Sequence, residues 1–473
     1  MKSQSLSKGV LVVLIANVIS MLFNVLINFL QPKYLSVETF SVIKTFTLYL
    51  TLTGLFHLGY MDGMYIKYGG REVSELNRDE LSTNISTMRI LQVVISFLFL
   101  LVGLLLGDDV LVLFSILLIP FNMTMYFKLL YQATGEFSLY GRIMNVSTAA
   151  LFLGNLLLIF VFHRQGYFWY IAIQILIYIV IWLFLELDFH HKINTKFQIL
   201  KGSISEAVEM VKSGFFVMLG NFSSIFLTVM DRWLVKWLMT ALDFAGYSFA
   251  TSVEGFLNVA VTPFTITFYN YFCRVSDVKS VKKVHNLMLI VSTVIIILAF
   301  AIKFVVEVYL PDYLFSMNVL FILFASQVFF IIIKSVYVNL YKAHRKQTLY
   351  FKKLAIVMVL GFFVTLLCYY IFLCIEAIAI GTLISSIFWF VLCQMDFKEV
   401  SYDGKHLIYM LISVASFIFC GVAFNSIIGM LIYIGLIVIL GLAFIRTDYI
   451  ELLLFVKSKY YATLGVKSIE SKA

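Results

Sequence analysis

Polar side chains recur at helical spacing inside two long apolar stretches of the sequence. The stretches 9–30 and 214–238 each carry four polar residues spaced three, four and four positions apart, and the second set follows the first by 204 residues. Because successive residues of an α-helix turn by 100°, each set lies within about 80° on one helical face. The first set is Asn17, Ser20, Asn24 and Asn28, and the second is Asn221, Ser224, Thr228 and Arg232. In a membrane helix such a face must contact other protein or water rather than lipid.

These polar stripes have two interpretations. Asn and Ser side chains often join membrane helices through hydrogen bonds worth about 0.6 kcal/mol each. Four polar positions repeated in both halves favour instead a water-lined cavity that can bind a polar ligand. We expect Asn24 and Thr228 to line such a cavity, whereas helix–helix contacts would leave both protected from water.

Charged side chains also fall inside the apolar stretches, where each costs at least about 2.5 kcal/mol near the bilayer centre. They are Lys44, Arg89, Lys128, Asp231, Arg232, Glu254, Lys303, Glu307 and Lys334. Lys303 and Glu307 lie four residues apart near the expected outer end of a stretch, so we expect them to be structural. Lys128 and Lys334 recur 206 residues apart near the expected inner ends, and for them a structural, snorkelling role and a functional role both remain open.

Three of the charges favour a specific chemistry. Lys44 and Arg232 are cations suited to an anionic ligand. Glu254 lies near the middle of its stretch, where a carboxylate favours a role in ion or proton coupling. Asp231 is adjacent to Arg232, so the two side chains diverge by about 100°, and Asp231 is expected to pair with another helix, with ion coupling as the alternative. His57 stands alone on its helical face and is expected to be an ordinary packed histidine.

The elements that carry these residues must be membrane-spanning helices. The 473-residue chain is 62% hydrophobic and 13% charged, outside the range of soluble domains. Apolar runs able to cross about 30 Å of hydrocarbon recur from end to end. The predicted fold class is therefore all-α, a polytopic membrane protein of about 14 transmembrane helices, or twelve or thirteen if the closely spaced last four merge. The candidate spans are 9–30, 40–60, 88–106, 110–132, 141–162, 167–187, 214–238, 244–268, 285–308, 314–340, 354–375, 376–394, 406–425 and 428–446.

The distribution of basic residues predicts the orientation of the spans. With the N-terminus inside, the inner segments carry 26 Lys and Arg residues, the outer loops carry three, and six lie within spans. This bias favours cytoplasmic N- and C-termini, and it accounts for the net charge of +9 without a nucleic-acid partner. The five cysteines lie in the second half without a CxxC motif or a Cys/His cluster, so we expect buried thiols and no metal site.

The two stripes belong to an internal repeat. Lys128 and Tyr131 in the first half match Lys334 and Tyr337 in the second. Since each half contains six spans and begins inside, the repeats are predicted to be parallel and related by an axis along the membrane normal. The predicted organisation is an N-lobe of six helices (1–187), a cytoplasmic linker (188–213), a C-lobe of six helices (214–394), two additional helices (395–446) and a cytoplasmic interfacial tail (447–473).

The loops between the spans argue against an enzyme. The predicted outer loops are very short, for example 163–166 and 239–243, and leave no domain to position a sugar and acid–base groups. No Gly-rich phosphate-binding motif indicates the use of ATP. We therefore expect no catalytic residue and no cofactor. A membrane-embedded enzyme of polysaccharide synthesis is the less favoured alternative.

Several short motifs extend this interpretation: PKYL at 32–35, LGYMDGMYIKYGG at 58–70, the pair Asp231-Arg232, and FAGYSFA at 244–250. They resemble bacterial polysaccharide flippases, which translocate lipid-linked O-antigen or capsule repeat units and belong to the multidrug/oligosaccharidyl-lipid/polysaccharide exporter superfamily. The span count and the repeat extend the resemblance over the whole chain. The first span has no arginine, a departure from the lipid II flippase branch.

The resemblance implies a function. Such proteins move an undecaprenyl-pyrophosphate-linked oligosaccharide across the bacterial cytoplasmic (inner) membrane by alternating access, driven by an ion gradient of H⁺ or Na⁺. Lys44, Arg232, Lys128 and Lys334 would then bind pyrophosphate, and the Asn, Ser and Thr stripes would bind sugar. A cation-coupled multidrug or small-molecule exporter of the same superfamily is the alternative, although the carboxylate expected in its first span is absent.

Overall fold

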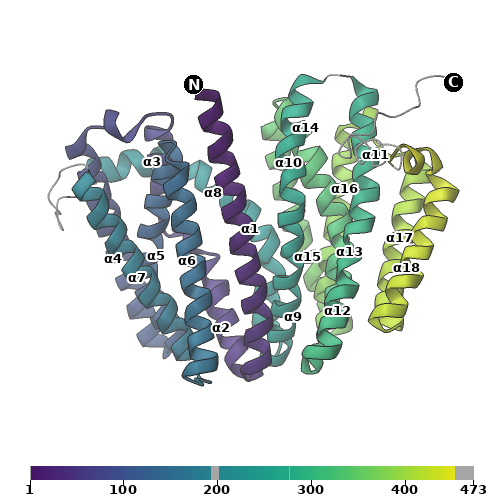
Figure 1. Ribbon diagram of the computed structural model, residues 1–473, viewed down its shortest axis with the longest axis horizontal. Helices are drawn as coiled ribbons and strands as arrows, with labels where there is room; N and C mark the ends of the chain where they lie inside the picture. Colours follow the sequence, from purple (N-terminus) through teal and green to yellow (C-terminus); the bar gives the residue numbers. More distant parts are fainter. Residues whose placement is uncertain (1, 193–201, 276, 453–473) are drawn as a thin grey trace, which may run out of the picture. The chain divides into compact units, whose positions relative to one another are not determined.

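The computed structural model describes residues 2–192, 202–275 and 277–452, and every regular element in these ranges is helical (Figure 1). Contacts divide the chain into two compact units, Met1–Ser248 and Phe249–Ala473. We refer to them as unit 1 and unit 2. The division falls inside α9 (Ala241–Glu254). The all-α class predicted from the sequence is therefore confirmed.

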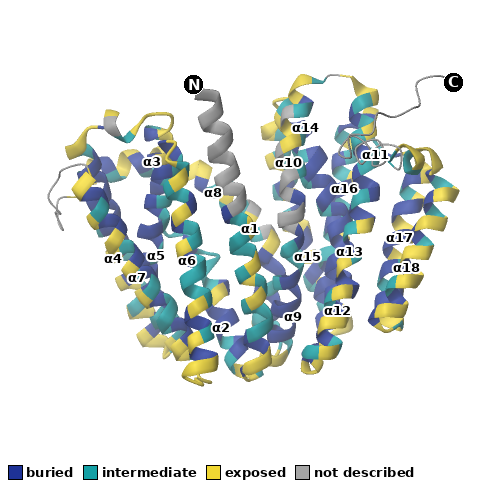
Figure 2. Cartoon of the chain, viewed as in Figure 1, coloured by how far each residue is buried: buried dark blue, intermediate teal, exposed yellow. Residues whose placement is uncertain are grey.

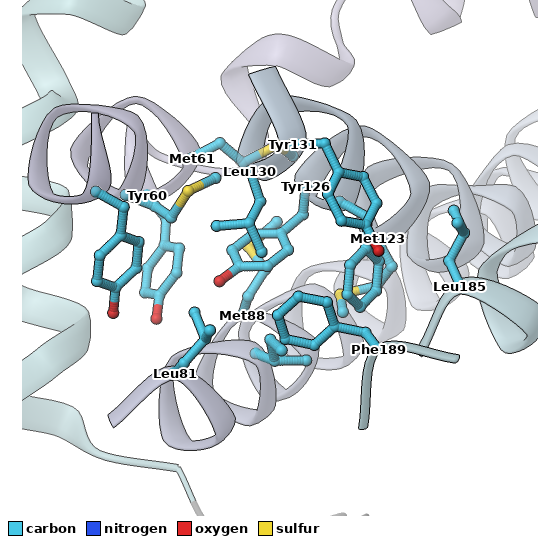
Figure 3. Packing of buried hydrophobic residues seen from close by; sticks show 14 of the residues in the cluster. Tyr60, Met61, Leu81, Met88, Met123, Tyr126, Leu130, Tyr131, Leu185 and Phe189 are labelled. Atoms are coloured by element: carbon cyan, nitrogen blue, oxygen red, sulfur yellow. The ribbon is translucent and has the colours of Figure 1, made fainter. Parts of the chain in front are cut away.

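Unit 1 is a helical bundle built around α5. Its helices are α1 (Lys2–Tyr34), α2 (Val37–Leu50), α3 (Tyr60–Tyr68), α4 (Arg78–Leu106), α5 (Asp109–Ala133), α6 (Phe137–Leu156), α7 (Tyr167–Lys192) and α8 (Ile204–Leu238). α5 contacts α2, α3, α4, α6 and α7, while α1 packs along α6 and α8 packs along α3. Tyr, Met, Leu and Phe side chains of α3, α4, α5 and α7 fill the space between these helices (Figure 3). This packing fixes α3, on which α8 rests.

Unit 2 is a second bundle, built around α13. After α9, its helices are α10 (Phe256–Arg274), α11 (Val278–Ile295), α12 (Leu298–Tyr309), α13 (Met317–Ile332), α14 (Val338–Ala343), α15 (Gln347–Phe372), α16 (Ile375–Asp396), α17 (Gly404–Ala423) and α18 (Ser426–Phe444). Nearly all residues of α13 are buried, and α13 contacts α11, α12, α16 and α17. A π-helical turn, Ile333–Tyr337, joins α13 to α14.

The fourteen predicted spans each coincide with a helix or with two helices in succession. Among the described residues, ten helices are long and apolar enough to cross a membrane, or twelve if each of two bent pairs is one span. The last four predicted spans form the separate helices α15, α16, α17 and α18. Many residues along α4 and α18 are exposed (Figure 2). Most of these exposed residues are large and apolar, as expected for surfaces in contact with lipid.

Two spans of unit 1 are broken. Between α2 and α3 the chain makes a short 3₁₀ turn (Thr53–Leu55), and the two parts of the span are bent by 53°. Leu58 and Gly59 close this break with φ angles of +52° and +84°, a left-handed conformation that glycine adopts freely and leucine only under strain. α8 bends by 68° between Ser223 and Thr228. Broken helices are the usual carriers of binding sites in membrane transporters.

The predicted lobe boundaries stay a prediction. Residues 193–201 of the expected linker and residues 453–473 of the expected interfacial tail lie outside the described residues. α8, which the sequence places first in the C-lobe, packs along α3 in unit 1.

Candidate substrate and coupling sites

Lys44 is the best-defined cation of unit 1. It lies on α2, its side chain is buried, and its Nζ donates a hydrogen bond of 2.6 Å to Asn28 Oδ1 on α1. The Phe40 ring lies 5.1 Å from Nζ. Asn28 in turn donates from Nδ2 to the Asn24 carbonyl at 2.8 Å. The last part of the α1 stripe therefore orients a buried ammonium group with a neutral oxygen.

Arg232 of α8 brings a second cation to Lys44. The two positive charges are close enough to repel each other. The Arg232 Nε atom is buried and has no hydrogen-bond partner among the described residues. Trp233, the next residue on α8, stacks on Tyr49 of α2 with the ring centroids 5.8 Å apart, and this contact holds α8 beside α2. An anion placed between the two cations would relieve their repulsion.

Asp231 accepts hydrogen bonds from two groups. Its Oδ2 accepts from the Tyr247 hydroxyl of α9 at 2.7 Å, and its Oδ1 accepts from the Arg232 backbone N–H at 2.8 Å. The bond from Tyr247 joins α8 to α9. Its role in ion coupling stays a prediction.

The other members of the α1 stripe lie in different surroundings. Asn17 is half-buried and Asn24 is exposed. Ser20 accepts a hydrogen bond of 3.1 Å from the Thr148 hydroxyl of α6, which joins the two helices. The stripe therefore combines a helix–helix contact at Ser20 with an exposed polar position at Asn24.

Two residues of the α8 stripe, Asn221 and Thr228, are exposed on either side of the helix bend. Asn221 precedes the bend, and its Nδ2 donates to Asp62 Oδ1 of α3 at 3.2 Å. Thr228 follows the bend and donates to its own helix, at the Ile225 carbonyl. The side chain of Ser224 lies outside the described residues. Substrate contact by Asn221 and Thr228 stays a prediction.

Unit 2 places Glu254 and Lys334 near each other. Glu254 is the last residue of α9, and Gly255 separates it from α10. It accepts a hydrogen bond from Gln327 of α13, and its negative charge acts on Lys334 in the π-helical turn. Lys334 Nζ also lies 5.5 Å from the Phe330 ring. Glu254 thus lies at a helix break and Lys334 in a π-helical turn, and such turns are frequent at functional sites.

Lys128 is the counterpart of Lys334 in unit 1. It lies on the central helix α5, is half-buried, and its Nζ is 5.1 Å from the Tyr140 ring of α6. Lys128 thus lies in the central helix of unit 1, and Lys334 lies in the π-helical turn that directly follows the central helix of unit 2. Neither contact identifies a substrate, so a role for either lysine in translocation stays a prediction.

Lys303 and Glu307 have the structural role expected for them. Lys303 Nζ of α12 donates to the carbonyls of Gly421 and Phe424, at 2.7 and 2.6 Å, where α17 ends. Glu307 accepts hydrogen bonds from the backbone N–H and hydroxyl of Ser426, where α18 begins. A cation at a helix C-terminus and an anion at an N-terminus both stabilise the helix ends.

The sequence analysis missed three polar groups. Glu186 of α7 is buried and accepts hydrogen bonds from Arg89 of α4 and, at 2.5 Å, from Trp182. Gln327, the partner of Glu254, lies in the apolar stretch 314–340 and belongs to no polar stripe that the sequence shows. Asp62, the partner of Asn221, entered only as part of a short motif. Apart from Trp182, their partners are distant in sequence, so no local pattern indicated them.

Comparisons with known proteins define the fold. No family model and no curated protein matches the sequence. Among solved structures, the chain is similar to the lipid II flippase MurJ in an inward closed conformation, with 15% identity, a TM-score of 0.56, and coverage of 93% of this chain and 99% of that one. It is also similar to a multidrug resistance MATE family transporter of the MOP superfamily, inward-facing, with 13% identity, a TM-score of 0.51, and coverage of 81% and 94%.

The protein is therefore a multi-pass membrane protein with the fold of these transporters. More particularly, its fold is the one shared by flippases and exporters of the MOP superfamily, the superfamily that its sequence motifs resemble.

Proposed function

We propose that this protein is a flippase that moves an undecaprenyl-pyrophosphate-linked oligosaccharide across the bacterial cytoplasmic membrane by alternating access, for synthesis of a cell-surface polysaccharide. Both termini lie in the cytoplasm in this proposal, consistent with the bias of 26 inner against three outer basic residues. Membrane lipid surrounds the protein, and H⁺ or Na⁺ supplies the driving force.

The observation that carries this proposal is the approach of Lys44 and Arg232. The stacking of Trp233 on Tyr49 holds α8, which carries Arg232, beside α2, which carries Lys44, so both cations can contribute to binding one anion. A pyrophosphate offers several oxygens with negative charge, and a guanidinium can bind two of them in a fork while an ammonium binds as a point charge. Asn28, which accepts a hydrogen bond from Lys44, is neutral and adds no negative charge that would repel such a ligand.

The polar stripes suit the rest of the substrate. Asn24, Asn221 and Thr228 are exposed, and their amides and hydroxyl can donate to and accept from sugar hydroxyls. Asn17 and Ser20 extend the same face of α1. Glu254 is better suited to ion coupling than to anion binding, since a carboxylate repels pyrophosphate. In unit 2 the negative charge of Glu254 acts on Lys334.

Translocation by the purified protein tests this function. The protein is reconstituted in vesicles with a fluorescent undecaprenyl-pyrophosphate disaccharide, and a membrane-impermeant quencher reports the label that reaches the opposite leaflet. Wild type and a control, Lys342→Gln, at an exposed cation of α14, should translocate the lipid. Lys44→Gln and Arg232→Gln should each lower the rate at least about tenfold, the loss expected when one charge-assisted hydrogen bond is removed.

Two results would contradict the proposal. Equal rates for a lipid without phosphate would remove the argument from Lys44 and Arg232. Export of cationic dyes without movement of the lipid would identify the alternative, a cation-coupled multidrug or small-molecule exporter. The fold accommodates this alternative, since a multidrug transporter is among the similar structures.

A further inference from the structure

The break between α2 and α3 brings three polar side chains of unit 1 together. His57 Nε2 lies 3.9 Å from Asp62 Oδ2. Asn221 Nδ2 of α8 donates to Asp62 Oδ1 at 3.2 Å. His57 is buried and Asp62 is half-buried. A carboxylate at a break in a membrane-spanning segment, facing a histidine and an amide from another helix, has the composition of an ion or proton site.

Close backbone contact holds α8 at this site. A Cβ atom on Gly63 of α3 would lie 2.1 Å from the Met210 carbonyl oxygen of α8, and one on Gly214 of α8 would lie 2.1 Å from the Gly59 carbonyl oxygen. The two backbones therefore touch at glycines, with no side chains between them. Asn221 lies about two helical turns beyond Gly214. The crossing thus positions the amide of Asn221 at Asp62.

Hydrogen bonding identifies Asp62 as the base of the pair. His57 Nδ1 accepts a hydrogen bond of 3.2 Å from the Gly59 backbone N–H, so in the neutral ring the proton is on Nε2, the nitrogen that faces Asp62. A further proton on His57 would have to enter at Nδ1 and would break the bond with Gly59. The carboxylate of Asp62 has free lone pairs and accepts the proton without that loss.

We propose that Asp62 is a proton-binding coupling site, and that its protonation releases Asn221 and with it the part of α8 that follows. The ionised carboxylate only accepts, and it faces two donors, Asn221 Nδ2–H and His57 Nε2–H. Uptake of one H⁺ forms one O–H bond and removes the negative charge of the carboxylate, so the charge-assisted hydrogen bond from the amide of Asn221 weakens. Release of the same H⁺ to water restores the contact. α8 bends just beyond Asn221 and carries Arg232, so this inference rests on the proposed function for its role in transport.

Charged groups on the packed elements are engaged elsewhere. Lys67 of α3 pairs with Glu80 at 2.7 Å and with Glu209 of α8 at 3.5 Å. The remaining titratable groups of α8 and α5 near this crossing are Glu206, which accepts from Asn84; Lys212, which is exposed; Tyr126, which donates to Asn84; and Lys128, which lies over Tyr140. Among the described residues, His57 and Asn221 are therefore the groups that face Asp62.

A distance measurement tests the site without substrate. Spin labels are placed at Ile66 of α3 and Ile225 of α8, both exposed, in full-length protein lacking its native cysteines. Between mildly alkaline and mildly acidic pH the distance between the labels should shift in the parent protein. The shift should persist in Glu209→Gln, a neighbouring carboxylate of α8 outside the site. It should be lost in Asp62→Asn, which stays at the acidic-form distance, and in Asn221→Ala.

Each outcome decides the inference. No shift in the parent protein, or a full shift in Asp62→Asn, would overturn it. If Asp62→Asn does not fold, the parent protein and Asn221→Ala still decide, since a full shift in Asn221→Ala is equally contrary. A normal shift in a protein that moves no lipid-linked oligosaccharide leaves the proton site standing and removes the proposed function. If Asp62→Asn translocates the lipid with an unchanged pH dependence, the proposed function stands and the proton site at Asp62 is removed.

Discussion

Lys44 Nζ on α2 and Asn28 Oδ1 on α1 are joined by a hydrogen bond of 2.6 Å. The bond fixes the position of a buried ammonium group and leaves its charge uncompensated by Asn28. An aspartate at position 28 would have nearly the same shape but would neutralise the cation. Substitutions at position 28 can therefore separate two effects on ligand binding: the orientation of the Lys44 ammonium group and its net charge.

Asn28→Asp should weaken binding of the lipid-linked pyrophosphate more than Asn28→Ala. The alanine variant loses only the orienting bond, which is worth about 1 kcal/mol or roughly fivefold in affinity. The aspartate variant also forms an ion pair with Lys44, so we expect a loss of about tenfold or more. Binding of the lipid to purified protein in detergent measures both, with Thr148→Ala as a control that removes the contact to Ser20 and a bond to the Met144 carbonyl of its own helix. Equal affinity of Asn28→Asp and wild type would exclude Lys44 from the site.

Arg232→Ala should lose more affinity than Arg232→Lys. The lysine keeps the charge but not the fork of donors that matches phosphate oxygens, and we expect losses of about 10- to 100-fold for alanine and a few-fold for lysine. Arg164→Ala, at an exposed arginine of unit 1, provides the control. The same binding measurement applies. If the two substitutions at position 232 behave alike, the guanidinium has no direct contact with pyrophosphate.

Glu254→Gln should slow translocation without weakening substrate binding. Glutamine preserves the shape and a hydrogen bond with Gln327 but removes the charge set against Lys334. For a coupling group we expect a rate loss within about 5- to 150-fold and a weaker dependence of the rate on pH. Vesicle translocation at several pH values measures this, with Asp312→Asn at an exposed carboxylate as control. Normal rates and normal pH dependence would make Glu254 structural.

Gly214→Ala should destabilise unit 1, whereas Gly220→Ala on the same helix should not. The added methyl group at position 214 would meet the Gly59 and Gly63 backbones, but at position 220 it would meet nothing within 4 Å. Overpacking costs about 1–3 kcal/mol, while alanine in place of glycine favours a helix by up to about 1 kcal/mol. Thermal unfolding in detergent compares the two variants. Equal melting temperatures would mean that α3 and α8 do not touch at their glycines.

Cysteine labelling from outside the cell should distinguish the two faces of the membrane. The bias in Lys and Arg predicts that position 164 lies outside and position 342 inside. In a background lacking the five native cysteines, Arg164→Cys should react with an impermeant thiol reagent and Lys342→Cys should react only after the cells are opened. The opposite pattern would invert the topology.

The long apolar stretches predicted the helices well, because a bilayer requires apolar segments long enough to cross it. All fourteen apolar stretches became helices, since a backbone in lipid must satisfy its own hydrogen bonds. The partners of the polar groups were less predictable. Asn28 with Lys44 and Asn221 with Asp62 depend on how α1, α3 and α8 cross, which no local pattern encodes. Likewise, His57 stands alone on its helical face in sequence, yet the break before α3 sets it beside Asp62.

Lys128 and Lys334, which the predicted repeat pairs, have different surroundings. Lys334 is set against the carboxylate of Glu254, whereas Lys128 lies against the neutral ring of Tyr140. The two lysines that the predicted repeat pairs therefore differ in their electrostatic surroundings: the negative charge of Glu254 acts on Lys334, and a neutral ring faces Lys128. Under the proposed function, the cations of unit 1 would therefore attract an anionic substrate more strongly than Lys334 of unit 2, whose charge is opposed by that of Glu254.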